Sequence, residues 1–77
     1  MEAPIEAELL SASDVARFLS VSLRQVRNLD YQGLLPIPLR LKGSVRWSRS
    51  ELRAWIAAGT PKRETWELQK RMAATAR

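Results

Sequence analysis

Three segments of the chain repeat the residue pattern that starts an α-helix. Each places an acidic or amide residue three positions after a serine: Ser11 with Asp14, Ser22 with Gln25, and Ser48 with Glu51. In this pattern the serine oxygen accepts the backbone N–H of the later residue, whose side chain reaches back to the N–H of the serine. Asp14 has the shortest of the three side chains, so we expect the weakest cap there. Three helix starts so close together indicate a small, mainly helical domain.

Each of these serines also lies between two apolar residues that can pack together across the helix start: Leu10 with Val15, Val21 with Val26, and Trp47 with Leu52. The first two helices are predicted over residues 12–19 and 23–32, and the turn between them is short enough to form a helix-turn-helix shape. Each has one inward apolar stripe, made of Val15, Phe18 and Leu19 in the first and Leu23, Val26 and Leu29 in the second. Gly33 occupies the left-handed position that ends such a helix.

The second helix is predicted to turn four side chains away from its apolar stripe: Arg24, Arg27, Asn28 and Tyr31. Guanidinium, amide and hydroxyl groups on one helix are those that reach base edges and phosphates in the major groove of DNA. A solvated helix face is the simpler interpretation, and it suits Arg24. It suits Tyr31 less well, although that ring could also cover the neighbouring hairpin.

A β-hairpin is predicted over residues 39–47, after Pro36 and Pro38 end the helical stretch. Residues on both sides of Gly43 alternate apolar with basic or polar side chains, as half-buried strands do. The register that brings the apolar residues to one face pairs Leu41 with Val45 and Leu39 with Trp47. A two-residue turn that pairs Lys42 with Val45 would mix the faces, so we expect a three-residue loop, residues 42–44.

The outer face of this hairpin is then basic. Arg40 and Arg46 would share it, with Lys42 and Ser44 at the tip. Two neighbouring arginines repel each other, so an anionic partner explains them better than solvent does. The alternative is a structural hairpin whose like charges stay hydrated.

A third helix is predicted over residues 49–58, ending at Gly59, with an inward stripe of Leu52, Trp55 and Ile56. Trp47 and Trp55 are assigned to the core of a domain that has few other large residues, rather than to base stacking, which needs exposed rings.

A fourth helix is predicted over residues 61–74, with Thr60 as its N-cap and Pro61 as its first residue. Its apolar residues fall on two faces. Trp66 can dock on the domain, whereas Leu68 and Met72 remain outward.

The charge is distributed unevenly along the chain. The net charge is +5, but residues 1–14 carry −4 and residues 15–53 carry +6. A basic block inside a folded domain indicates a polyanionic partner, most often nucleic acid, although a surface tuned for solubility gives the same count. Residues 1–8 show no periodicity, and we expect a flexible acidic tail there.

The composition excludes several classes of function. Without cysteine or histidine, the chain cannot form disulfides, zinc fingers, iron–sulfur clusters or a histidine-based catalytic site, and we expect no cofactor. The three glycines are isolated, and the carboxylates suit helix caps better than paired acid–base chemistry, so we expect no enzyme activity. No apolar run resembles a membrane span or a signal peptide, so we expect a cytoplasmic, nucleoid-associated protein with no membrane partner.

Several blocks of residues, in this order, resemble a known family. The opening from Leu9 to Ser22, then Gly33-Leu34-Leu35-Pro36, Val45-Arg46-Trp47 and the segment from Ser50 to Ile56 are similar to MerR-like excisionase and AlpA-type phage regulator domains. The resemblance covers residues 9–59 and implies a winged helix-turn-helix fold, mainly α with a small β-hairpin. It implies a DNA-binding helix at residues 22–32, a DNA-contacting wing at 39–47, and roles in transcription control or site-specific excision. At the end of the second helix, Leu29-Asp30-Tyr31 replaces the family's more usual basic residues.

We therefore divide the chain into a flexible acidic tail (residues 1–8), a winged helix-turn-helix domain (9–59) and a C-terminal helix (60–77). We expect sequence-specific binding of double-stranded DNA by a small phage-type transcriptional regulator or excisionase. The expected DNA contacts are Ser22, Arg24, Gln25, Arg27, Asn28, Tyr31, Arg40, Lys42, Ser44 and Arg46. A second copy on adjacent DNA sites, or a recombinase, is the expected further partner. The alternatives are a protein-interaction adaptor for a recombinase or polymerase, and a phage DNA-packaging recognition subunit.

Overall fold

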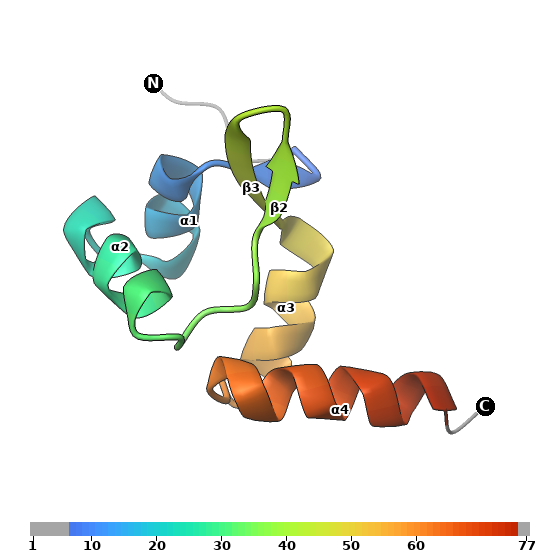
Figure 1. The fold of residues 1–77 in the computed structure, drawn as a ribbon. Helices are drawn as coiled ribbons and strands as arrows, with labels where there is room; N and C mark the ends of the chain where they lie inside the picture. The colour runs from blue at the N-terminus through green and yellow to red at the C-terminus, as the bar shows by residue number, and fades with distance from the viewer. Residues whose placement is uncertain (1–6, 76–77) are drawn as a thin grey trace.

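The structure, a computed structural model, describes residues 7–75, so most of the predicted acidic tail lies outside it. In chain order the elements are β1 (Leu9–Leu10), α1 (Ala12–Leu19), α2 (Leu23–Tyr31), β2 (Leu39–Leu41), β3 (Ser44–Ser48), α3 (Arg49–Ala57) and α4 (Arg63–Thr75). Helices α1 and α2 lie to one side of the small sheet, α3 continues from β3, and α4 crosses the far end of α3 (Figure 1). The predicted fold class, a winged helix-turn-helix, is confirmed. Among the described residues no helix is long and apolar enough to cross a membrane.

The three predicted helix starts are confirmed. The Oγ atoms of the three serines accept the backbone N–H groups of Asp14, Gln25 and Glu51 at 3.2, 3.0 and 3.1 Å. Asp14, expected to form the weakest cap, forms the complete one, because its Oδ2 also accepts the N–H of Ser11 at 3.2 Å. The longer side chain of Glu51 is drawn away from its own helix start to Trp66 and Lys70 of α4.

The turn and the end of α2 follow from backbone geometry. Ser20 has a left-handed φ of 58°, and the N–H of Val21 donates to the carbonyl of Ala16 at 2.9 Å, which closes α1 and starts the turn. Helix α2 ends one residue earlier than predicted. Gly33 has a φ of 71°, as predicted, and lets the N–H of Leu34 donate to the carbonyl of Leu29 at 2.8 Å.

The core lies between α1, α2, the sheet and α3. Its buried residues come from every helix, from β1 and β3, and from the segment between α2 and β2: Leu10, Val15, Ala16, Val26, Leu35, Trp47, Leu52, Trp55 and Trp66. Phe18, Leu19 and Leu29 are half-buried against it, as expected. Leu23 and Ile56, predicted to face inward, are exposed, because they stand in the first turn of α2 and the last turn of α3, beyond the reach of the core.

The hairpin forms in a different register from the predicted one. Its pairs are Leu39 with Arg46, Arg40 with Val45, and Leu41 with Ser44, so the turn has two residues, Lys42 and Gly43. Both have a positive φ, 47° and 91°, and a turn of this kind matches the right-handed twist of the strands. The predicted apolar underside is therefore wrong, and Leu39 and Leu41 are 47% and 50% exposed on the outer face.

The register also separates the two arginines that were predicted to share a face. Directly paired residues of antiparallel strands project from the same side of the sheet. Arg40 pairs with Val45 and so lies on the inner face, whereas Arg46 pairs with Leu39 on the outer face.

Strand β1, which was not predicted, extends the hairpin to a three-stranded sheet in the order β1-β3-β2. Leu10 pairs with Trp47, and the N–H of Arg49 donates to the carbonyl of Glu8 at 2.8 Å. This strand has two residues, too few to show an alternating pattern, and it forms because the inner edge of β3 offers it backbone partners.

Helix α4 begins at Arg63, so the prediction that Thr60 is its N-cap is wrong. Thr60 has a left-handed φ of 51°, and its hydroxyl donates to the carbonyl of Gly59 at 2.6 Å. Pro61, in turn, accepts a hydrogen bond from the indole Nε1 of Trp55 at 2.7 Å. The indole thus fixes the loop that directs α4 back across α3.

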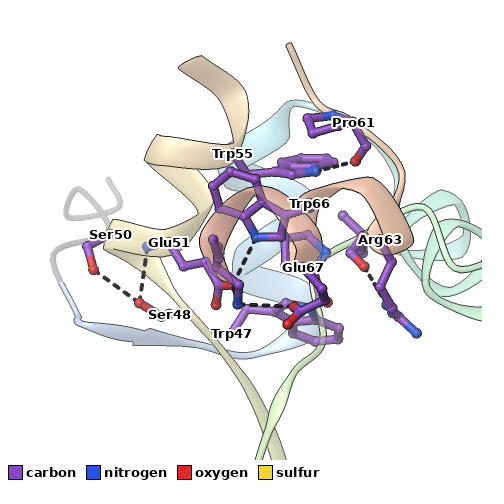
Figure 2. A network of polar contacts seen from close by, with 12 residues as sticks. Trp47, Ser48, Ser50, Glu51, Trp55, Pro61, Arg63, Trp66 and Glu67 are labelled. Carbon is purple, nitrogen blue, oxygen red and sulfur yellow. Dashed lines mark hydrogen bonds and ion pairs between the residues drawn. The ribbon is translucent and has the colours of Figure 1, made fainter. Parts of the chain in front are cut away.

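The three tryptophans are structural, as predicted for Trp47 and Trp55. Trp47 Nε1 donates to the carbonyl of Pro36 at 3.0 Å, and Trp66 Nε1 donates to Glu51 Oε2 at 3.0 Å. Figure 2 shows Trp55 and Trp66 directed toward their acceptors, Pro61 and Glu51. Because each buried indole has a partner for its N–H, all three rings can be buried without loss of a hydrogen bond.

Lys70 holds α4 on α3 through the carboxylate of Glu51, and it also contacts Glu67 of its own helix. Its Nζ contacts Glu51 and lies 3.0 Å from Glu67 Oε2, and it stands 5.9 Å from the centroid of the Trp66 ring. Burial alone would lower the pKa of Lys70, but the hydrogen bonds and charges of the two glutamates outweigh it and raise that pKa above its ordinary value.

Candidate nucleic-acid interface

Helix α2 presents a polar face to solvent. Val26 is fully buried and Leu29 is half-buried, which anchors the opposite side of the helix on the core. All four side chains that were predicted to point outward are exposed: Arg24, Arg27, Asn28 and Tyr31. Tyr31 is 91% exposed, so its ring does not cover the hairpin.

The first turn of α2 adds two further predicted residues. Ser22 and Gln25 are exposed, and the Ser22 Oγ is occupied as an acceptor by the N–H of Gln25. The hydroxyl hydrogen of Ser22 and the amide group of Gln25 are not used by this cap, and both can donate to an anion.

A groove of about 370 Å³ separates α2 from the hairpin. Its polar rim consists of Arg27, Asp30, Tyr31 and Arg40, and its apolar floor consists of Ala12, Val26, Val45 and Trp47. Residues of the recognition-type helix and of the hairpin thus meet at one concave surface. Arg40 reaches it because the observed register turns this side chain inward.

The remaining predicted residues of the hairpin do not line this groove. Lys42 is exposed at the tip, in the turn itself. Ser44 and Arg46 are half-buried on the outer face, and Arg46 Nη1 donates to the carbonyl of Val45 at 2.8 Å. The structure therefore brings Arg40 toward α2 and leaves Arg46 on the other side of the strand pair.

The basic side chains of this surface keep their charge available. In the part of the chain that the structure describes, four of them form no ion pair: Arg24, Arg27, Arg40 and Lys42. By contrast, Arg49, Arg63 and Lys70 each pair with a carboxylate. The positive charge on α2 and the hairpin is thus left unneutralised, as it also is at the exposed Arg53 and Lys62 elsewhere among the described residues.

One contact at this surface had no signal in the sequence. Asp30, on the rim of the groove, forms an ion pair with Arg63 at the start of α4, with 2.7 Å between Oδ1 and Nη2. The two residues are 33 positions apart, and no local spacing connects them.

Comparison with known families agrees with this geometry. A family model described as a helix-turn-helix domain matches residues 9–60, which cover β1 to the end of α3 and include the whole candidate surface. No curated protein and no solved structure gives a significant match. Since the match covers most of the chain and the two helices and their turn are present in the fold, this chain belongs to the helix-turn-helix domain family, whose members bind DNA.

Proposed function

We propose that this chain is a small sequence-specific regulator of phage type, a transcription factor or an excisionase, that binds double-stranded DNA with α2 in the major groove. The observation that supports it most is that Arg27 of α2 and Arg40 of the hairpin, both exposed and without an ion pair among the described residues, line one groove. Both roles require the same surface, since each begins with recognition of a duplex site. Such a protein would act in the cytoplasm, on the nucleoid.

In this proposal, α2 contacts the edges of the bases and the hairpin contacts the phosphate backbone of the DNA. Arg24 and Arg27 can each donate two hydrogen bonds to guanine, and Asn28 can pair with the edge of adenine. Phosphates would be held by the hydroxyl, amide and basic groups around α2 and the wing, from Ser22, Gln25, Tyr31, Arg40, Lys42, Ser44 and Arg46.

Salt dependence tests this proposal. About five phosphates neutralised would give a slope of log affinity against log salt near −4 to −5. Binding of the intact chain to a pool of duplexes is measured by filter retention at several salt concentrations. The Arg27→Ala/Arg46→Ala variant should lose most of its affinity, whereas Arg53→Ala should lose little, because Arg53 is exposed on α3, outside α2 and the hairpin.

The opposite results would support the alternatives. A flat salt response, or full affinity after loss of Arg27 and Arg46, would point to a protein-interaction adaptor for a recombinase or polymerase. Binding confined to one phage packaging sequence would point to a DNA-packaging recognition subunit.

The proposed further partner is a second copy of the chain on an adjacent DNA site. Leu68 and Met72 are 52% and 61% exposed on α4, one helical turn apart, while Trp66 on the other side of the helix is buried. Because one short recognition helix reads few base pairs, contact between neighbouring copies would add the specificity that a single domain lacks. A recombinase is the competing occupant, and it would leave binding to DNA alone non-cooperative.

A further inference from the structure

Asp30 is an acidic group on a surface that is otherwise basic. It lines the same groove as Arg27, Tyr31 and Arg40, close to the end of α2. Its side chain is 36% exposed, so the carboxylate reaches the surface that a phosphate would approach. An unpaired carboxylate here would repel the phosphates that the proposed function requires at this groove.

Arg63 forms an ion pair with the carboxylate of Asp30. Its Nη2 lies 2.7 Å from Asp30 Oδ1, and its Nε donates to the carbonyl of Leu35 at 2.7 Å. The backbone N–H of Arg63 also donates to the carbonyl of Gly33 at 3.0 Å. Figure 2 shows the guanidinium held beside its acceptor at the start of α4. The planar fork of arginine makes both side-chain contacts at once, from Nε to the carbonyl and from Nη2 to the carboxylate.

The position of Arg63 is set by contacts of α4 with the rest of the domain. Trp66 is buried and bonded to Glu51, and Lys70 contacts the same carboxylate. These contacts fix the first turn of α4 against α3, and with it the backbone of Arg63. Arg63 nevertheless lies outside residues 9–60, the part that matches the helix-turn-helix family.

We infer that Arg63 is a positioning residue for DNA binding: it neutralises Asp30 and so makes the C-terminal end of α2 compatible with the phosphate backbone. The helix that follows the family domain then completes the DNA-binding face without touching DNA. This inference rests on the proposed function, because it assigns a role to a contact at the same groove.

A double-substitution cycle tests the inference on the full chain. Arg63→Gln leaves Asp30 unpaired and should weaken duplex binding about tenfold at low salt. Asp30→Asn removes the charge at nearly constant shape and should bind at least as tightly as the unchanged chain. The double variant Asp30→Asn/Arg63→Gln should recover the affinity of the unchanged chain, since the two positions then again carry no net charge.

Two controls separate this electrostatic role from general effects. Lys62→Gln removes one positive charge from an exposed neighbour of Arg63 and should change affinity less than about twofold, because the partner of Asp30 is Arg63 and stays in place. The deficit of Arg63→Gln should also shrink as salt is raised, because screening weakens repulsion between Asp30 and phosphate. Circular dichroism monitors folding of each variant.

Each outcome decides the matter. If Asp30→Asn fails to restore binding in the double variant, or itself weakens binding, Arg63 acts only as a structural tie and the inference is wrong. If Arg63→Gln does not fold, the affinity of Asp30→Asn alone, together with its salt dependence, still decides. If the unchanged chain does not bind duplex DNA, the proposed function fails and the inference fails with it, a result distinct from the first.

Discussion

At the scale of single residues, each of the three indole groups has two structural roles. Its ring fills part of the core, and its N–H donates a hydrogen bond that ties a loop or a helix to the domain. Trp47 shows this best. It is buried, pairs with Leu10 through the backbone of β3, and donates to Pro36 in the segment that leads to the hairpin. A change at this position therefore affects both packing and a buried carbonyl group.

Trp47→Ala is expected to lower the free energy of unfolding by about 3–5 kcal/mol, as large-to-small core substitutions do. Trp47→Phe keeps most of the apolar volume but leaves the carbonyl of Pro36 without its donor, so the expected loss is about 1–3 kcal/mol. Urea denaturation followed by circular dichroism measures both. A Trp47→Ala variant that stays as stable as the unchanged chain but loses affinity for DNA would instead place Trp47 in the interface.

Asn28 and Lys42 are expected to affect DNA binding in different ways. Asn28→Ala should relax the choice of sequence at one position, with about 1–3 kcal/mol of discrimination lost, because its amide is proposed to contact a base. Lys42→Gln should weaken binding to all sequences alike and reduce the salt slope by about one. Selection of duplexes from a random pool measures the first effect, and titrations at several salt concentrations measure the second. Equal loss of discrimination in both variants would contradict this division.

At the scale of elements, the helices could be predicted from the sequence and the hairpin register could not. Serine caps and their apolar partners are local, so the bounds of α1 agree with the prediction to the residue. The register was inferred from burying Leu39 and Leu41, but the preference of the turn for positive φ at Lys42 and Gly43 outweighed that burial. In the same way, the pairs Asp30–Arg63 and Glu51–Trp66 join distant positions, which residue spacing cannot reveal.

Gly43→Ala tests the turn. Its φ of 91° suits glycine, and an alanine there should destabilise the fold by about 1–2 kcal/mol through backbone strain alone, since no atom stands near its Cβ position. Ser44→Ala, the adjacent strand residue, should cost less than about 0.5 kcal/mol. Urea denaturation compares the two. Equal stability of both variants would mean that the turn is not under this constraint.

The attachment of α4 should depend on pH through Lys70. Its pKa is raised in the folded chain, so its stabilising contribution is complete at neutral pH and is lost as the pH rises through that pKa, above about pH 10. Lys70→Gln should be less stable at neutral pH and should show a flatter fall in the alkaline range, while Lys62→Gln should follow the unchanged chain. Denaturation series at neutral and alkaline pH measure this. If the stability of Lys70→Gln fell equally steeply in the alkaline range, the loss of stability would be due to other titrating groups.

At the scale of the whole molecule, the helix-turn-helix domain and α4 form one unit. The domain could be inferred from residue blocks along the chain, and so could the two faces of α4, with Trp66 buried and Leu68 and Met72 exposed as predicted. How α4 attaches could not be inferred, because its contacts reach back to α3 and to the end of α2.

Leu68→Gln/Met72→Gln is expected to reduce cooperative binding to DNA that carries two adjacent sites, by roughly tenfold, while affinity for a single site is unchanged. Point substitutions are preferable to removal of the helix, because Trp66 belongs to the core. Ala74→Gln, at another exposed position of α4, is the control. Mobility-shift titrations on one-site and two-site DNA give the comparison. Superimposable two-site titrations of the double variant and the unchanged chain would exclude α4 as the contact between copies.

Because Trp66 is buried, its fluorescence can report whether α4 is attached to the domain. Its indole is the one on α4, and it emits from a site closed by Glu51 and Lys70. In a variant with phenylalanine at positions 47 and 55, the emission would come from Trp66 alone. A shift of that emission to longer wavelength before the loss of helical signal would mean that α4 detaches first, and a simultaneous change would mean that the chain unfolds as one body.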